Sequence, residues 1–195
     1  MSTLLERLRQ ETRPLHEQTE QLLYAEALRA GTLTAPEYVH LLRIHLAFHR
    51  ALEQAIDRYP IFFRDYEAVN RRKAPWLESD LTYLSEAHPP GLPELFADWS
   101  PAELLGAAYV GEGSMLGGTV VWKLLQQNPA LQPLLTPARF YQGYGPATGR
   151  YWRDFGLFLT QQAVAEPDEV VSGAQRAFKA YQVLFWATQF SAGPD

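Results

Sequence analysis

The stretch YVGEGSMLGGTVVWKLL spans residues 109–125 and has the composition of a buried helix, but it is rich in glycine. Its four glycines and one just upstream are Gly106, Gly111, Gly113, Gly117 and Gly118. Interior glycine costs roughly 1 kcal/mol relative to alanine, so five would cost on the order of 5 kcal/mol, comparable to the stability of a small domain. Either a second helix approaches closely here, or a flat ligand lies on bare backbone. Gly113 and Gly117, four residues apart, share one helix face.

Helical periodicity dominates the rest of the chain, and no stretch alternates as a strand would. Three capping boxes predict helix starts, namely Thr3 with Glu6, Thr34 with Glu37, and Ser100 with Glu103. Pro14 should bend or split the first helix. Further helices are expected over 62–74, 147–164 and 168–190, with a short one from Pro137. The pattern predicts one all-α domain of seven or eight helices over residues 1–195.

Composition excludes several classes of protein. The 195-residue chain has a net charge of −5, which argues against a general nucleic-acid binder. It has no cysteine, so disulfides, iron–sulfur clusters and cysteine nucleophiles are excluded. No apolar run approaches the length of a membrane span, and the first residues lack the pattern of a signal peptide. We expect a cytoplasmic protein with no membrane span.

Two groups of histidines could bind a metal. His45, His49 and Glu53 follow at intervals of four and could hold zinc or iron, although a polar helix face would show the same spacing. His16 precedes Glu20 by four residues, so the carboxylate could accept a hydrogen bond from Nδ1–H and leave Nε2 free for a metal. An ordinary surface pair is the alternative for these two residues.

Three segments together resemble the heme oxygenase family. They are LRQETRPLHEQTE at 8–20, YVGEGSMLGGTVV at 109–121 and GYGPATGRYWRDF at 143–155. The order and spacing are closer to the bacterial branch, and within it to the bacteriophytochrome-associated enzymes, than to the animal enzymes. The resemblance implies a single multi-helical domain with heme between a proximal N-terminal helix and a kinked, glycine-rich distal helix.

The resemblance also assigns site residues. His16 matches the proximal iron ligand, and Glu20 matches the group that orients it. Gly113 and Gly117 match the distal glycines over the heme, and Ser114 stands where animal enzymes have an aspartate. The residues that match basic or hydroxyl groups near the heme propionates are Arg9, Tyr109, Arg150 and Arg153.

The activity implied by the resemblance is oxidative opening of heme to biliverdin, with release of CO and iron. Heme would be both substrate and cofactor, O2 the oxidant, and a ferredoxin or reductase the electron donor. A biliverdin-binding phytochrome would be the acceptor of the product. Two alternatives remain, a heme carrier of the same fold and a nonheme metal protein that uses His45, His49 and Glu53. Thiaminase-like catalysis would need a cysteine, which the chain lacks.

Overall fold

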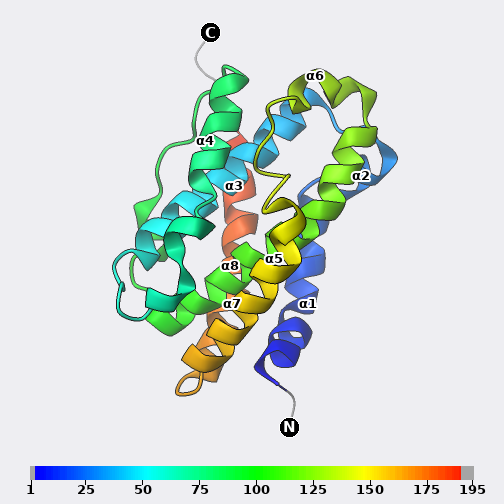
Figure 1. The fold of residues 1–195 in the computed structure, drawn as a ribbon. Helices are drawn as coiled ribbons and strands as arrows, with labels where there is room; N and C mark the ends of the chain where they lie inside the picture. The colour runs from blue at the N-terminus through cyan, green and yellow to red at the C-terminus, as the bar shows by residue number, and fades with distance from the viewer. Residues whose placement is uncertain (1–2, 190–195) are drawn as a thin grey trace.

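The computed structural model describes residues 3–189, in which eight α-helices are joined by turns and five short 3₁₀ segments (Figure 1). The α-helices are α1 (Leu4–Leu22), α2 (Ala25–Ala30), α3 (Ala35–Ile56), α4 (Ala74–Tyr83), α5 (Pro101–Gln127), α6 (Gln132–Leu135), α7 (Thr148–Gln162) and α8 (Pro167–Gln189). The 3₁₀ segments are η1 (Arg64–Tyr66), η2 (Ala68–Arg71), η3 (Pro93–Phe96), η4 (Pro129–Leu131) and η5 (Gly145–Ala147). This described part of the chain contains no strand, which confirms the all-α prediction.

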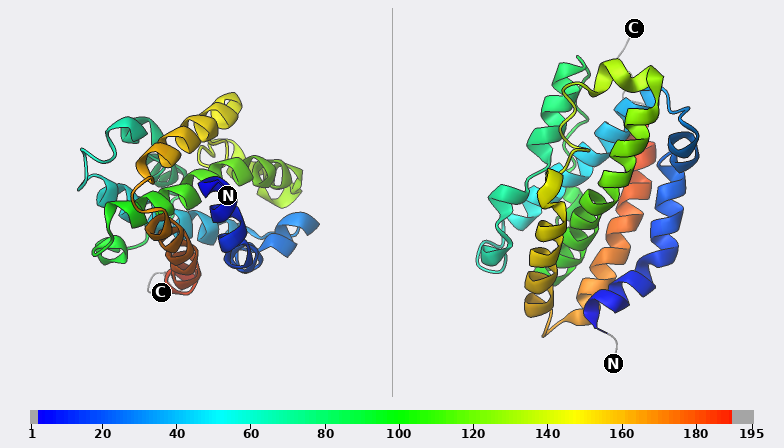
Figure 2. Two further views of the ribbon diagram at one scale, coloured as in Figure 1. Left: turned by 90° about the horizontal axis from the view of Figure 1, so that it is seen from below. Right: turned by 45° about the vertical axis from the view of Figure 1, so that its right-hand side comes forward.

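The helix starts follow the sequence signals closely. Thr3, Thr34 and Ser100 each cap a helix, and each forms the reciprocal capping box with the glutamate three residues on. Pro14 lies inside α1 without splitting it, and α1 changes direction part-way along its length (Figure 2, right). Side-chain capping therefore fixes where α1, α3 and α5 begin.

Two predicted helices are wrong. The segment 62–74 forms η1 and η2 rather than one α-helix, because Glu67 between them takes the left-handed conformation at φ 55°, which interrupts an α-helix. No α-helix begins at Pro137, where a short helix was expected. The short helix of this region is α6, which lies earlier in the chain and ends at Leu135. The following residues form turns and η5 before α7 begins.

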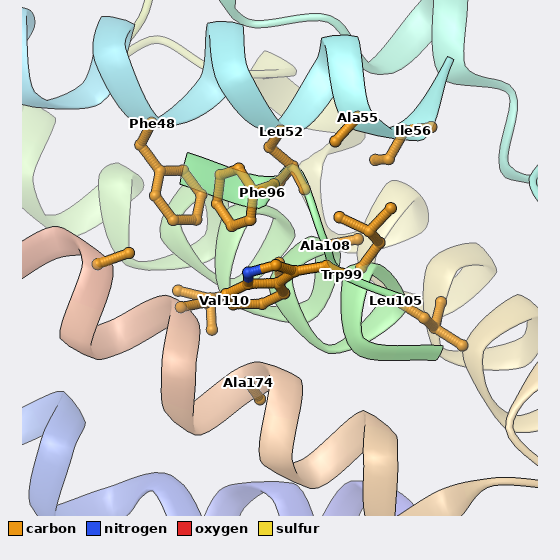
Figure 3. Close-up of a cluster of buried hydrophobic side chains, with 14 of the residues drawn as sticks. Phe48, Leu52, Ala55, Ile56, Phe96, Trp99, Leu105, Ala108, Val110 and Ala174 are labelled. Carbon is orange, nitrogen blue, oxygen red and sulfur yellow. The ribbon is translucent and has the colours of Figure 1, made fainter. Parts of the chain in front are cut away.

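The core lies around α5, which packs most extensively against α8 and also against α3 and α7. Apolar side chains from three helices and from η3 meet there, as Figure 3 shows for Leu52, Ala108, Ala174 and Phe96. In Figure 2 (right), α1 runs alongside α8. α1 also contacts α7. Within residues 3–189, no helix combines the length and apolar character needed to cross a membrane.

Candidate functional site

One face of α5 is bare. A Cβ added to Gly117 would meet no atom within 4 Å, and a Cβ on Gly113 would meet only the edge of one aromatic ring at 3.9 Å. On the same stretch of helix, Leu116 is 42% exposed and Val120 is 58% exposed. Exposed helix faces are normally polar, so glycine and exposed apolar side chains together are unusual. Such a surface fits a flat, largely apolar ligand.

The upstream glycines serve helix packing instead. A Cβ on Gly106 would lie 2.1 Å from the carbonyl oxygen of Val170, and a Cβ on Gly173 would lie 2.2 Å from a carbonyl oxygen of α5. The backbones of α5 and α8 therefore touch where these two glycines meet. Gly111 makes room for the His49 ring, whose Cε1 would lie 3.3 Å from an added Cβ. The two interpretations of the glycines thus apply to different parts of the same helix.

His16 projects from α1 with about half of its side chain exposed. Its ring meets the edge of the Phe178 ring at a centroid distance of 5.6 Å. The ring nitrogen nearest Glu20 is Nε2, 3.6 Å from Oε1, which is longer than a hydrogen bond and differs from the expected Nδ1 contact. The imidazole is therefore open to solvent and available as a ligand for iron.

Tyr109 brings three helices together beside Gly113. Burial raises the pKa of the Tyr109 hydroxyl, while the neighbouring charge of Arg9 and a hydrogen bond with Thr12 oppose that rise. The Tyr109 ring also contacts Trp152 of α7, with ring centroids 5.8 Å apart. Trp152 is the residue whose ring edge would lie 3.9 Å from a Cβ on Gly113. Arg9, Tyr109 and Gly113, assigned to one site from sequence, are thus close in space.

The three candidate arginines are exposed and have no acidic side chain as an ion-pair partner within the described part of the chain. Arg150 lies over the Tyr151 ring, 5.5 Å from its centroid, and Arg153 follows Trp152 directly on α7. Arg9 lies beside Tyr109 on α1. Guanidinium groups without a protein counter-ion are free to bind carboxylates through paired hydrogen bonds.

Ser114 and Glu112 point in different directions. The Ser114 hydroxyl donates to the carbonyl oxygen of Gly111 at 2.7 Å, within its own helix. The Glu112 carboxylate is buried and contacts Arg71 and Lys73, so it lies away from the open face as expected. Sequence reasoning missed the part played by Trp152, although the residue stands inside the third segment of the resemblance.

The alternative metal site at His45, His49 and Glu53 is contradicted by the structure. Among residues 3–189, no three His, Cys, Asp or Glu side chains are placed to hold a metal ion. His45 Nδ1 is hydrogen-bonded to the Tyr181 hydroxyl at 3.2 Å, and burial lowers the pKa of His45 to about 3. The Glu53 carboxylate instead accepts the backbone N–H of Lys73 at 2.6 Å. These side chains are tied into the core rather than grouped around an ion.

The sequence matches the protein-family model described as heme oxygenase over residues 2–187. The chain belongs to the heme oxygenase family. It is therefore an enzyme of heme degradation, with heme as substrate and cofactor, and the family membership opposes the carrier alternative. The open face of α5 and the accessible His16 ring are compatible with a heme between α1 and α5.

Three bacterial heme oxygenases illustrate the relationship. The heme oxygenase of Xanthomonas campestris pv. campestris is 30% identical over 168 residues, which cover 83% of this chain and 96% of that protein. The structure of the NO- and CO-bound heme oxygenase from Neisseria meningitidis has a TM-score of 0.77 at 21% identity, covering 100% of this chain and 96% of that one. The heme oxygenase structure from Leptospira interrogans has a TM-score of 0.78 at 17% identity, covering 94% and 98% respectively. The two structures establish the shared fold, and all three relatives are bacterial.

Proposed function

We propose that this enzyme opens heme oxidatively to biliverdin and releases CO and iron, with O2 as the oxidant. The observation that carries the proposal is the open face of α5, where Gly113 and Gly117 leave bare backbone beside exposed apolar side chains. When bound, heme would supply both the iron that activates oxygen and the ring that is opened. The protein contributes binding, orientation and proton supply.

His16 is the proposed ligand of the heme iron. Its half-exposed ring can turn either nitrogen toward a ligand, because the 3.6 Å separation from Glu20 leaves the imidazole without a hydrogen bond to that residue. A small rotation would bring the Glu20 carboxylate into hydrogen-bonding range of one nitrogen, which fixes the tautomer and leaves the other nitrogen for iron. We therefore assign Glu20 as the group that orients His16.

The proposed distal residues are Gly113, Gly117 and Ser114. The glycines let backbone approach the heme closely, as no side chain could. The single hydroxyl proton of Ser114 goes to the carbonyl oxygen of Gly111, and the Tyr181 hydroxyl lies beside it. A serine oxygen has two lone pairs, so it can still accept a hydrogen bond from water. Protons would thus reach the heme through ordered water rather than from a carboxylic acid at this position.

The proposed contacts to the heme propionates are Arg9, Tyr109, Arg150 and Arg153. The exposure of the three guanidinium groups and their lack of acidic partners in the described residues support this assignment. Their positions would set the rotation of the heme ring in its plane. That rotation decides which ring edge faces the distal glycines.

We also propose a separate electron donor, a ferredoxin or a reductase, because the sequence contains no segment that resembles a flavin or nicotinamide site. The resemblance of the sequence motifs to the bacteriophytochrome-associated enzymes is the ground on which we propose a biliverdin-binding phytochrome as an acceptor of the product. A single domain over residues 1–195 and a cytoplasmic location complete the proposal. Pull-down of the purified protein with a phytochrome from the same organism, loaded or unloaded with bilin, would test the acceptor.

Addition of hemin tests the proposed reaction. The apoprotein should give a one-to-one complex with the absorption spectrum of a histidine-ligated heme. A reductant in air should then convert the heme band to that of biliverdin, with one CO released per heme. Stable binding without conversion would identify a carrier and contradict the proposal.

A further inference from the structure

The glycine segment of α5 has few side chains that could fix its position. Four of the eight residues from 111 to 118 are glycines. Of the others, Ser114 donates to a carbonyl of its own helix and lies beside the Tyr181 hydroxyl of α8, and Leu116 is 42% exposed. Only Glu112 and Met115 in this segment have buried side chains. Glu112 is thus the one charged group of the segment, and its side chain is buried against other parts of the chain.

The Glu112 carboxylate is 1% exposed and is surrounded by donors. Arg71 Nη1 lies 2.8 Å from Oε2, and the Lys73 ammonium contacts Oε1. The hydroxyl of Tyr66 donates to Oε1 at 3.0 Å, and that of Tyr144 lies 3.1 Å from both oxygens. A carboxylate has about four acceptor positions, so these four donors satisfy it.

The donors connect α5 to segments on two sides. Tyr66 belongs to η1, Arg71 to η2, and Lys73 stands directly before α4. Tyr144 precedes η5, and its ring stacks on Tyr151 of α7 with centroids 4.1 Å apart. Arg71 also donates to the Tyr151 carbonyl oxygen at 3.2 Å. The cluster therefore joins the middle of α5 to the 64–73 region and to the start of α7.

A buried ion cluster is a poor source of stability, because apolar residues of the same volume commonly stabilise a core as well or better. Its bonds are directional, however, and an apolar contact is not. Consecutive helix residues project about 100° apart, so the direction of the Glu112 side chain fixes that of Gly113. The cluster thus fixes the rotation of α5 about its axis and its position along that axis, and therefore where the open face lies.

We infer that Glu112 is a positioning residue, whose buried bonds to Arg71, Lys73, Tyr66 and Tyr144 hold the glycine segment of α5 in one orientation toward the heme. The inference rests on the proposed function. It explains why an ionic group stands in an otherwise uncharged and glycine-rich segment. It also accounts for the left-handed conformation of Glu67. That residue separates η1 from η2, and each of the two segments provides one donor to Glu112, Tyr66 from η1 and Arg71 from η2.

Tyr144→Phe tests the inference with little risk to the fold, because it deletes one hydroxyl and keeps the stacked ring. Tyr151→Phe is the matched control, since within residues 3–189 its hydroxyl makes no hydrogen bond to protein. Amide hydrogen exchange of the apoprotein over 109–118 should be about tenfold faster in Tyr144→Phe, as expected for loss of a hydrogen bond to a charge. The control should match the parent.

The second measurement is the infrared band of CO added to the reduced heme complex. We expect Tyr144→Phe to broaden or split the band, because the helix face over the heme takes more than one orientation. The control should keep the single parental band. Unchanged exchange, or faster exchange with an unchanged CO band, would overturn the inference and leave Glu112 a residue of the core only.

A stronger variant combines Glu112→Gln with Lys73→Met, which removes the ion pair and keeps the summed charge with Arg71 unchanged. It should show a larger increase in exchange and a larger change in the CO band than Tyr144→Phe. Parental behaviour of this folded double variant would also overturn the inference. Failure of the parent protein to bind hemin would instead reject the proposed function, so the two failures are distinguishable.

Discussion

The edge of the Trp152 ring lies 3.9 Å from the position of a Cβ on Gly113, whereas Gly117, one turn further along α5, faces open space. Both positions accept a methyl group without a clash, because 3.9 Å is ordinary van der Waals contact. Helix packing thus does not require glycine at either position. A requirement for glycine there would come from what binds on the open face.

Gly117→Ala should therefore separate stability from activity. Alanine is the better helix former by roughly 1 kcal/mol, so the melting temperature of the apoprotein should stay the same or rise. Breakdown of bound heme should slow, because the methyl group occupies space over the ring or displaces water there. Thermal melting and single-turnover decay of the heme band measure the two effects. Lower stability with normal turnover would count against a distal site at this helix.

Gly106→Ala is the matched contrast. Its new methyl group would collide with the carbonyl oxygen of Val170, so α5 and α8 must separate. Overpacking of this kind typically costs about 1–3 kcal/mol, and rigid backbone as the obstacle favours the upper part of that range. Urea denaturation should show the loss in the apoprotein. A variant as stable as the parent would show that the helices do not cross as closely as described.

Neutral substitution of the candidate arginines should weaken heme binding. Arg9→Gln, Arg150→Gln and Arg153→Gln each remove a charged hydrogen-bond donor, worth about 1.5–3 kcal/mol where it contacts a carboxylate. Hemin titration gives the affinity, and chromatography of the biliverdin isomers reports the rotation of the ring. If all three single variants matched the parent in both measurements, the propionate assignment would be wrong.

His45 should make folding stability fall in acid. Burial lowers its pKa from 6.5 to about 3, so below pH 6.5 the unfolded chain binds a proton that the folded protein does not. Stability should fall by up to about 1.4 kcal/mol for each pH unit below that value. His45→Gln removes this contribution, so its stability deficit relative to the parent should shrink as pH falls from 7.5 to 5.5. A constant difference in urea denaturation would contradict the burial of a neutral His45.

The helix boundaries were predictable where local chemistry decides them. Ser100 and Glu103 start α5, and Asn128 with Pro129 ends it, because caps and proline act within a few residues. The 62–74 region was mispredicted because its conformation depends on a distant partner. Arg71 and Lys73 turn inward to Glu112, some forty residues away, and local helical preference gives no sign of that contact.

The candidate site was likewise predictable only where the pattern within one helix decides it. Spacing alone placed Gly113 and Gly117 on one face, but only the fold shows that Gly106 meets α8 while those two stay open. The partner of Gly106 is Gly173, far along the chain, so no pattern within α5 could separate packing from binding. His45 and His49 have the spacing of metal ligands, and their burial in the core is a tertiary property.

The absorption spectrum of hemin-loaded His16→Ala is the most direct test of a heme held between α1 and the open face of α5. The half-exposed His16 ring contributes little to folding, so stability should change by no more than about 0.5 kcal/mol. The histidine-ligated heme band and turnover should be lost, and added imidazole should restore the band. His88→Ala, which also removes an exposed histidine, should leave both unchanged. An unchanged band and normal turnover in His16→Ala would contradict this placement of the heme.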